Sequence, residues 1–266
     1  MFELSSKTQD LTYCITDKSS LYFSCILKNE AAGIIWGNTS HHPNFLLVFS
    51  PYQEGFQLMG EPLSQNEWAA FKNWFIGTII PFIKKQELEY FEFGADTKEL
   101  ADMFQAIFTD YEIFSAPQKI FRWVQTSFVP ICPSEYQVEK VDSDFFSKPY
   151  SNKDFIQSEL ERAYGTLDSF FKYGIAYVAI YQNTIVARAD MLFSHGGYGN
   201  ISVNTDELHR RKGLSTLLTM KTIEETLHLG LTPVWDCTDD NLPSEKTALK
   251  CGFKLIREDI ISWFCI

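Results

Sequence analysis

Residues Arg210 to Ser215 combine positive charge with a glycine directly before an apolar helix pattern. Their order is Arg210, Arg211, Lys212, Gly213, Leu214, Ser215. A diphosphate at the start of a helix needs free backbone N–H groups, a residue without a Cβ, and nearby cations. The helix dipole adds only about 0.3–1 kcal/mol for one exposed anion, so donors and cations carry much of the remainder. The segment predicts a polyanion site, although a solvated basic turn explains the same residues.

Two strands and two helices must position this turn. Residues 199–205 (GNISVNT) alternate apolar Ile201 and Val203 with polar positions, which predicts a strand with two unlike faces. A helix is expected over residues 213–229 and a second strand over residues 234–238. Asn241 then opens another helix, with a proline harmlessly placed in its first turn.

Two spaced signatures in this region resemble those of the GCN5-related N-acetyltransferase (GNAT) superfamily. The first is Arg or Gln, two residues, Gly, one residue, then Gly or Ala, and here Ser215 takes the last small position. The second is an Asn that opens a helix ending in Gly-Phe, here Asn241 to Phe253. The resemblance covers about residues 134–266. It implies an α/β fold of the mixed-sheet (α+β) kind and acyl-coenzyme A as the polyanion.

The resemblance also implies a role for each matching position. The N–H groups of Arg211 to Ser215 would bind the pyrophosphate of acetyl-CoA, and the strand Ile201 to Thr205 would pair with the pantetheine arm. Asn241 is equally a good helix cap. The implied coenzyme-binding residues are Val203, Asn204, Thr205, Arg210, Arg211, Lys212, Gly213, Leu214, Ser215, Asn241 and Ser244.

Transfer to an amine needs a neutral nitrogen, so a carboxylate or a water relay should lie near the reacting thioester. Asp236 is the first candidate, because its strand should separate from the Ile201 strand where the thioester enters. Asp190 and Glu207 come next. A solvated or capping carboxylate is the competing interpretation for all three.

The proton donor for the leaving thiolate is the departure from the family pattern. Many GNAT enzymes carry a Tyr seven residues after the Asn, and Ala248 stands there. Water or Cys251 would then serve, or the thiolate leaves without an acid. Trp235 suits the core better than an acceptor pocket. Cys237 has no histidine placed as its base and is interpreted as a buried thiol.

At 266 residues the chain exceeds one typical GNAT domain, and a shift of about 145 residues lays the first half on the second in element order. The sequence predicts a degenerate GNAT-like domain over residues 1–126 and a coenzyme-binding domain over 134–266. The first half's counterpart of the basic turn, Gln65 to Ala70, has no glycine or cation and places Trp68 opposite Gly213. An unrelated α/β domain is the alternative.

Composition excludes several functions. The net charge of −11 disfavours nucleic acid as a partner. Six cysteines and five histidines show no metal-ligand spacing, so no metal is expected. No apolar signal region or membrane-length apolar run is seen, which predicts a cytoplasmic protein without a membrane partner.

Together these patterns predict an N-acyltransferase that moves acetyl from acetyl-CoA to a primary amine of a small molecule or protein. A non-catalytic acyl-CoA sensor or scaffold is the alternative. A transferase that uses charged tRNA is disfavoured by the acidic charge.

Overall fold

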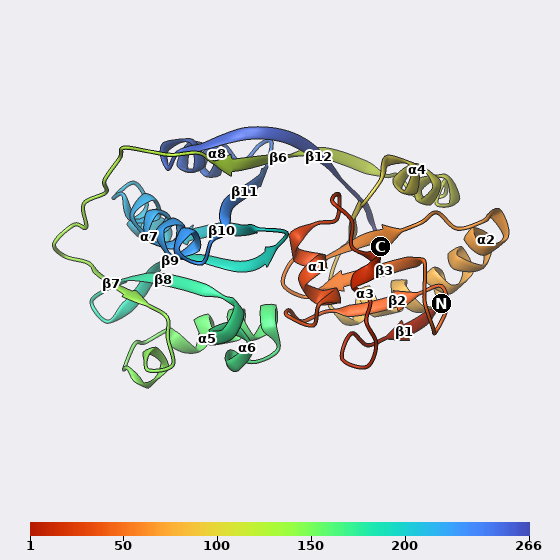
Figure 1. Ribbon diagram of the computed structural model, residues 1–266, viewed down its shortest axis with the longest axis horizontal. Helices are drawn as coiled ribbons and strands as arrows, with labels where there is room; N and C mark the ends of the chain where they lie inside the picture. Colours follow the sequence, from red (N-terminus) through yellow and green to blue (C-terminus); the bar gives the residue numbers. More distant parts are fainter. The chain divides into compact units, whose positions relative to one another are not determined.

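The computed structural model describes residues 1–266. The chain forms two compact units (Figure 1): residues 1–117 with 260–266, and residues 118–259. Two long strands, β6 (Phe114–Trp123) and β12 (Phe253–Cys265), each carry the chain from one unit into the other.

The first unit is a mixed sheet with helices and a core rich in phenylalanine. Its strands pair in the order β1-β2-β3-β4-β5-β12. The strands of this unit alone are β1 (Phe2–Leu4), β2 (Ile34–Gly37), β3 (Phe45–Ser50), β4 (Gly55–Gly60) and β5 (Tyr90–Ala95). Its helices are α1 (Leu21–Leu27), α2 (Gln65–Trp74), α3 (Ile80–Lys85) and α4 (Lys98–Ile107), with a 3-10 turn at Thr12–Cys14 and a π turn at Phe75–Ile79. The π turn precedes Pro81, which has no amide hydrogen to donate to the preceding turn.

The second unit repeats this plan. Its strands pair in the order β6-β11-β10-β9-β8-β7. Besides β6 they are β7 (Gln137–Lys140), β8 (Ile175–Tyr181), β9 (Thr184–His195), β10 (Tyr198–Thr205) and β11 (Thr232–Thr238). Its helices are α5 (Lys153–Tyr164), α6 (Leu167–Tyr173), α7 (Leu214–His228) and α8 (Leu242–Lys250), with 3-10 turns at Phe145–Ser147 and Glu207–His209. Gly196 and Gly197, both at positive φ, make the β9–β10 hairpin turn.

The two halves share strand directions as well as element order. In each, four strands joined by three antiparallel pairings lead to one parallel pair, β4–β5 in the first and β10–β11 in the second. The predicted mixed-sheet fold and its repetition are therefore confirmed.

The two halves exchange their final strands. Residues Ser262–Cys265 of β12 pair with β5 in the first unit, and residues Gln118–Arg122 of β6 pair with β11 in the second. If each half kept the strand that ends it in the chain, β6 would be the last strand of the first sheet and β12 the last strand of the second. Residues 260–266 consequently belong to the first unit, whereas a division by chain order assigns them to the second.

The predicted alignment of Trp68 with Gly213 is wrong by about one helical turn. Helix α2 already begins at Gln65, so Ser64 is the residue that precedes it, as Gly213 precedes α7. Trp68 lies inside α2 and is 3% exposed in the phenylalanine-rich core. A bulky side chain in the turn is therefore not what distinguishes the first unit from the second.

Candidate active site

Strands β10 and β11 pair only at their amino ends and then separate. The parallel register joins Tyr198, Gly199 and Asn200 to Thr232, Pro233 and Val234. Beyond this point β10 continues to Thr205 with β9 as its partner, and β11 continues to Thr238 with β6 as its partner. One edge of residues 201–205 is therefore left open between the two strands, as the sequence predicted.

The turn after β10 presents a row of backbone donors. Gly213 has φ +83° and Arg211 has φ +63°, so two left-handed residues flank Lys212. Such alternation turns successive N–H groups towards a common concavity. The backbone N–H groups of residues 211–216 donate no hydrogen bond within the protein; the adjoining donors are Arg210, to Glu207, and Leu217, to Gly213. Helix α7 has neither a side-chain cap nor an acidic residue in its first turn.

A Cβ at Gly213 would meet nothing within 4 Å. The space beside Gly213 is therefore open, and N–H groups without an acceptor in the protein lie next to it at the positive end of a helix, an arrangement that fits a pyrophosphate. Two further contacts close the turn onto β10. Nε of Arg210 donates to the carbonyl oxygen of Thr205 at 3.1 Å, and the hydroxyls of Thr205 and Ser215 lie 3.0 Å apart.

The start of α8 is occupied by structural contacts. The side chain of Asn241 accepts the N–H of Ser244 at 3.2 Å and so caps the helix. The Ser244 hydroxyl accepts the indole N–H of Trp235 at 3.0 Å. Trp235 is 2% exposed and belongs to the core, as the sequence favoured. Ala248 has no proton to donate to the thiolate. Because it is fully buried, it also opens no space for another proton donor.

Asp236 lies on β11 two residues beyond the last position paired with β10. Its Oδ1 accepts the side-chain amide of Asn200 at 2.5 Å, and its Oδ2 accepts the side-chain amide of Gln118 at 2.5 Å. Trp235 and Cys237 pack into the core on the opposite face of β11. Two amide donors fix the direction of this carboxylate.

The other two candidate carboxylates lie in different surroundings. Asp190 on β9 is 2% exposed, accepts from the Ser202 hydroxyl at 2.6 Å, and pairs with Nε of Arg188 at 2.7 Å. Burial raises the pKa of Asp190. Glu207 lies in the turn itself, with its side chain 83% exposed and 3.2 Å from the Arg210 guanidinium.

The two thiols near α8 are buried. Burial raises the pKa of Cys237, and it raises the pKa of Cys251 to about 12. Cys251 has no exposed surface. A thiol without access to solvent or substrate neither attacks nor donates a proton readily, so Cys251 is a poor replacement for the family acid.

The corresponding region of the first unit is closed. Phe56, Gln57 and Leu58 pair with residues 93–95, so the pairing reaches the last residue of β5 and stops two residues before the end of β4. At the start of α2, Ser64 and Glu67 form a capping box, in which the Glu67 carboxylate accepts the Ser64 N–H at 2.9 Å. A carboxylate at a helix start repels phosphate, and β4 has only two residues beyond its pairing with β5, whereas β10 has five beyond its pairing with β11.

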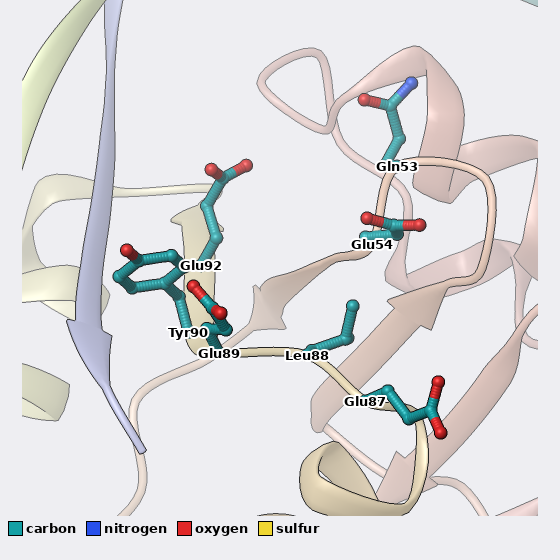
Figure 2. A pocket seen from close by; sticks show the side chains of 7 residues that line it. All are labelled: Gln53, Glu54, Glu87, Leu88, Glu89, Tyr90 and Glu92. Carbon is teal, nitrogen blue, oxygen red and sulfur yellow. The ribbon is translucent and has the colours of Figure 1, made fainter.

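A pocket of the first unit lies elsewhere, at the amino end of β5 (Figure 2). Ligands of sheets with parallel strands bind at the carboxyl ends. Four of its seven lining residues are glutamates, which disfavours a phosphate-bearing ligand. The lining residues are Gln53, Glu54, Glu87, Leu88, Glu89, Tyr90 and Glu92.

No group of three or more His, Cys, Asp or Glu side chains is arranged to hold a metal ion. No helix combines the length and apolar character needed to cross a bilayer.

Comparison with known proteins identifies the family. A family model described as GNAT acetyltransferase matches residues 12–260, so the chain belongs to the GNAT acetyltransferase family. An uncharacterized N-acetyltransferase of Bacillus subtilis, YdfB, is 24% identical over 126 residues, which are 47% of this chain and 47% of that protein. The match thus spans about half the length of this curated relative.

Two solved structures show the same fold over most of the chain. A GCN5-related N-acetyltransferase-like protein from Streptococcus suis superposes with a TM-score of 0.64, at 16% identity and 98% coverage of both chains. A tandem GNAT protein from the clavulanic acid biosynthesis pathway gives a TM-score of 0.56, at 14% identity, with 91% of this chain and 86% of that one covered.

Some residues of the site lay outside the sequence prediction. Asn200 and Gln118, which hold Asp236, belong to no signature. The sequence did contain a signal for Asn200, because the residue before the apolar Ile201 lies on the opposite, polar face of the strand. Gln118 gave none, because its contact with Asp236 joins residues 118 positions apart.

Proposed function

We propose that the second unit binds acetyl-CoA between β10, β11 and the start of α7, and that the protein transfers the acetyl group to a primary amine of a small molecule or protein. The observation that carries this proposal is the turn at residues 211–215, where N–H donors without an acceptor and an unobstructed Gly213 follow a strand with an open edge. Membership of an acetyltransferase family supports the choice of ligand.

Each part of the site has a distinct task in the proposed reaction. The N–H groups of residues 211–215 hold the pyrophosphate, and residues 203–205 of β10 align the pantetheine arm. When bound, the coenzyme supplies a thioester as the acyl donor. A backbone N–H of the open β10 edge polarises its carbonyl oxygen.

Asp236 is the proposed base. The amine nitrogen forms a bond to the carbonyl carbon, the carbon–sulfur bond breaks, and the proton lost by nitrogen passes to the Asp236 carboxylate directly or through one water. The sulfur leaves as thiolate or takes a proton from water, because Ala248 has no acidic proton and Cys251 is buried. Asp190 ranks second, because it is buried and paired with the Arg188 guanidinium, whereas Asp236 is only half-buried. Glu207 ranks last, because it is exposed in the 3-10 turn that precedes the proposed phosphate-binding residues.

The first test is calorimetric titration of the full chain with acetyl-CoA. We expect one site per chain in the wild type and a Kd raised at least about tenfold in Gly213→Ala, where a Cβ occupies the anion space and the left-handed backbone is strained. Gly230→Ala is the matched control. Gly230 also has positive φ (+74°) and open surroundings, but it lies at the other end of α7. Its variant carries similar strain and should bind normally.

The outcomes separate the possibilities. No binding by the wild type rejects acetyl-CoA as the ligand, and two sites per chain reject a closed first unit. Equal weakening in both glycine variants assigns the effect to helix strain.

A non-catalytic acyl-CoA sensor is the second candidate function. It is favoured by one observation, the burial of Ala248 at the position of the family's proton donor. Release of free thiol from acetyl-CoA in the presence of a panel of amines distinguishes it from the enzyme. Binding without amine-dependent thiol release across the panel favours the sensor.

A further inference from the structure

Lys212 is the cation of the turn whose side chain is held from a distant part of the chain. Its Nζ donates to the hydroxyl oxygen of Tyr136 at 2.9 Å and lies 5.6 Å from the centre of the Tyr136 ring. Tyr136 precedes β7, 76 positions earlier in the sequence. An exposed lysine normally samples many rotamers, so this contact restricts the ammonium to one place beside Gly213.

Tyr136 is itself fixed on three sides. Its ring is 6% exposed and packs 5.4 Å from the ring of Tyr181 and 5.7 Å from that of His209, between ring centres. The Tyr181 and His209 rings lie 5.0 Å apart. Its backbone N–H donates to the carbonyl oxygen of Pro133 at 3.0 Å. The hydroxyl that receives Lys212 therefore cannot swing away.

The ammonium of Lys212 fixes the direction of its own hydrogen bond, and the direction between Tyr136 and His209 depends on the tautomer of His209. The ammonium of Lys212 only donates, so the Tyr136 oxygen accepts. The Tyr136 hydroxyl hydrogen is then available to Nδ1 of His209, which lies 2.8 Å away. Nδ1 accepts that hydrogen only when His209 is neutral and carries its proton on Nε2.

The partner of Lys212 is neutral, which distinguishes it from Arg210. Arg210 is paired with the Glu207 carboxylate, and that pairing offsets part of its charge. The Tyr136 hydroxyl orients Lys212 without cancelling its charge. The other charged groups around Lys212 are its neighbour Arg211 and the Glu135 carboxylate. The pKa of Lys212 is raised mainly by the hydrogen bond to Tyr136, and the negative charge of Glu135 also contributes.

We propose that Tyr136 is a positioning residue, which holds the Lys212 ammonium against the phosphate-binding turn and so prepares the site for the coenzyme. This inference rests on the proposed binding of acetyl-CoA. A long side chain that is already ordered loses less conformational entropy when the ligand arrives. Tyr136 thereby raises affinity without touching the coenzyme.

A double-mutant cycle tests this role by acetyl-CoA titration. Tyr136→Phe keeps the ring and its packing but removes the hydroxyl, and we expect the Kd to rise about two- to tenfold. Lys212→Met removes the charge and keeps most of the length. In the Lys212→Met background, Tyr136→Phe should have no further effect, because the group on which it acts is gone.

Tyr177→Phe is the matched control for the loss of a tyrosine hydroxyl. The Tyr177 hydroxyl donates to Glu225 on α7, and its ring also faces a lysine, Lys221. This pair lies on the body of α7 and not in the turn before it. The variant should therefore bind acetyl-CoA as tightly as the wild type.

The results separate this inference from the proposed function. A wild type that does not bind acetyl-CoA rejects both. A wild type that binds, with Tyr136→Phe binding equally tightly, overturns only the role of Tyr136. That role is also overturned if Tyr136→Phe weakens binding equally with and without Lys212, because Tyr136 would then act on general packing.

A second measurement needs no substitution at Tyr136. The ¹⁵N shifts of His209 report which ring nitrogen carries the proton. We expect the neutral Nε2–H form in the wild type. A neutral Nδ1–H form overturns the chain of donors from Lys212 through Tyr136.

Discussion

The side-chain amide of Asn200 donates to Oδ1 of Asp236 across 2.5 Å, at the point where β10 and β11 separate. Asn200 occupies the last paired position of β10, and Asp236 lies just beyond the last paired position of β11. The contact therefore spans the beginning of the opening, while Gln118 on β6 holds the other carboxylate oxygen. The proposed base is fixed from both neighbouring strands.

Asp236→Asn should lower kcat by about 10²–10⁴-fold, the usual contribution of a general base. The substitution keeps the size of the side chain but removes its capacity to take a proton. Acetyl-CoA binding should change little, because the substitution is remote from the phosphate turn. Thiol-release kinetics and calorimetry measure the two effects separately. Full activity in this variant would show that Asp236 is not the base.

Asp190→Asn should act on stability instead of on catalysis. It removes the charge that compensates Arg188, whose side chain is only 12% exposed. Breaking one partner of a buried ion pair typically costs about 3–5 kcal/mol. Thermal unfolding of the variant should therefore occur at a lower temperature, with kcat of the folded fraction retained. Loss of kcat in a well-folded Asp190→Asn protein would transfer the role of base from Asp236 to Asp190.

The capping box of the first unit gives a prediction with a pH dependence. Hydrogen bonds from Ser64 lower the pKa of Glu67 below its ordinary value of 4.5. A carboxylate with a lower pKa in the folded protein adds stability above its unfolded pKa, and this stability is lost as the pH falls through the folded value. Glu67→Ala should cost about 0.5–1 kcal/mol at pH 7, near the low end for caps because the site is exposed.

The difference in unfolding free energy between Glu67→Ala and wild type should shrink as the pH falls below 4.5. Glu67→Gln is the control, since Gln also accepts the Ser64 N–H but does not titrate. Its stability difference from Glu67→Ala should be independent of pH in this range. If the difference in unfolding free energy between wild type and Glu67→Ala does not change with pH, the Glu67 carboxylate does not stabilise the cap.

The six cysteines should divide by burial. Cys132 and Cys265 are exposed, whereas Cys14, Cys25, Cys237 and Cys251 are buried. Brief treatment of the native protein with a thiol reagent should label two sites per chain, and mass spectrometry should locate them at the exposed positions. Labelling of Cys251 in the native protein would reopen its candidacy as the proton donor for the thiolate.

The sequence predicted the second unit well because its signals are local. Gly213 before a helix and Asn241 at the next helix start are adjacent to the structures they specify, and the alternation around Ile201 identified β10. The sequence did not predict the left-handed conformation of Arg211, because a basic side chain has no preference for positive φ. The contacts of Asp236 and Lys212 with Gln118 and Tyr136 join residues far apart in the chain, so no spacing encoded them.

The strand exchange escaped prediction for a related reason. Both β6 and β12 have the composition of strands, and pattern alone does not specify which sheet edge a strand completes. Trp68 was misaligned because an apolar residue near a helix start fits both a turn and a buried first turn. The Ser64 and Glu67 pair, three residues apart, was the available signal for the true start of α2.

The exchange makes the first unit depend on the last residues of the chain. Phe264 on β12 is fully buried in the core of the first unit, with its ring centre 5.4 Å from that of Phe91. Phe264→Ala should cost about 3–5 kcal/mol, as for other large core truncations. Hydrogen exchange should accelerate in β5 and α4 of the first unit. Ile260→Ala, on the same strand but 60% exposed, is the matched control and should leave exchange unchanged.

The distribution of the exchange effect is what tests the strand assignment. If β12 completes the first sheet, amides of β4 and β5 lose protection in Phe264→Ala, while those of β8 and β9 keep theirs. Loss of protection confined to β10 and β11 would instead place the end of β12 in the second sheet, where position along the chain alone would put it. That result would contradict the exchange, because β6 and the end of β12 cannot both pair with the same edge of β11.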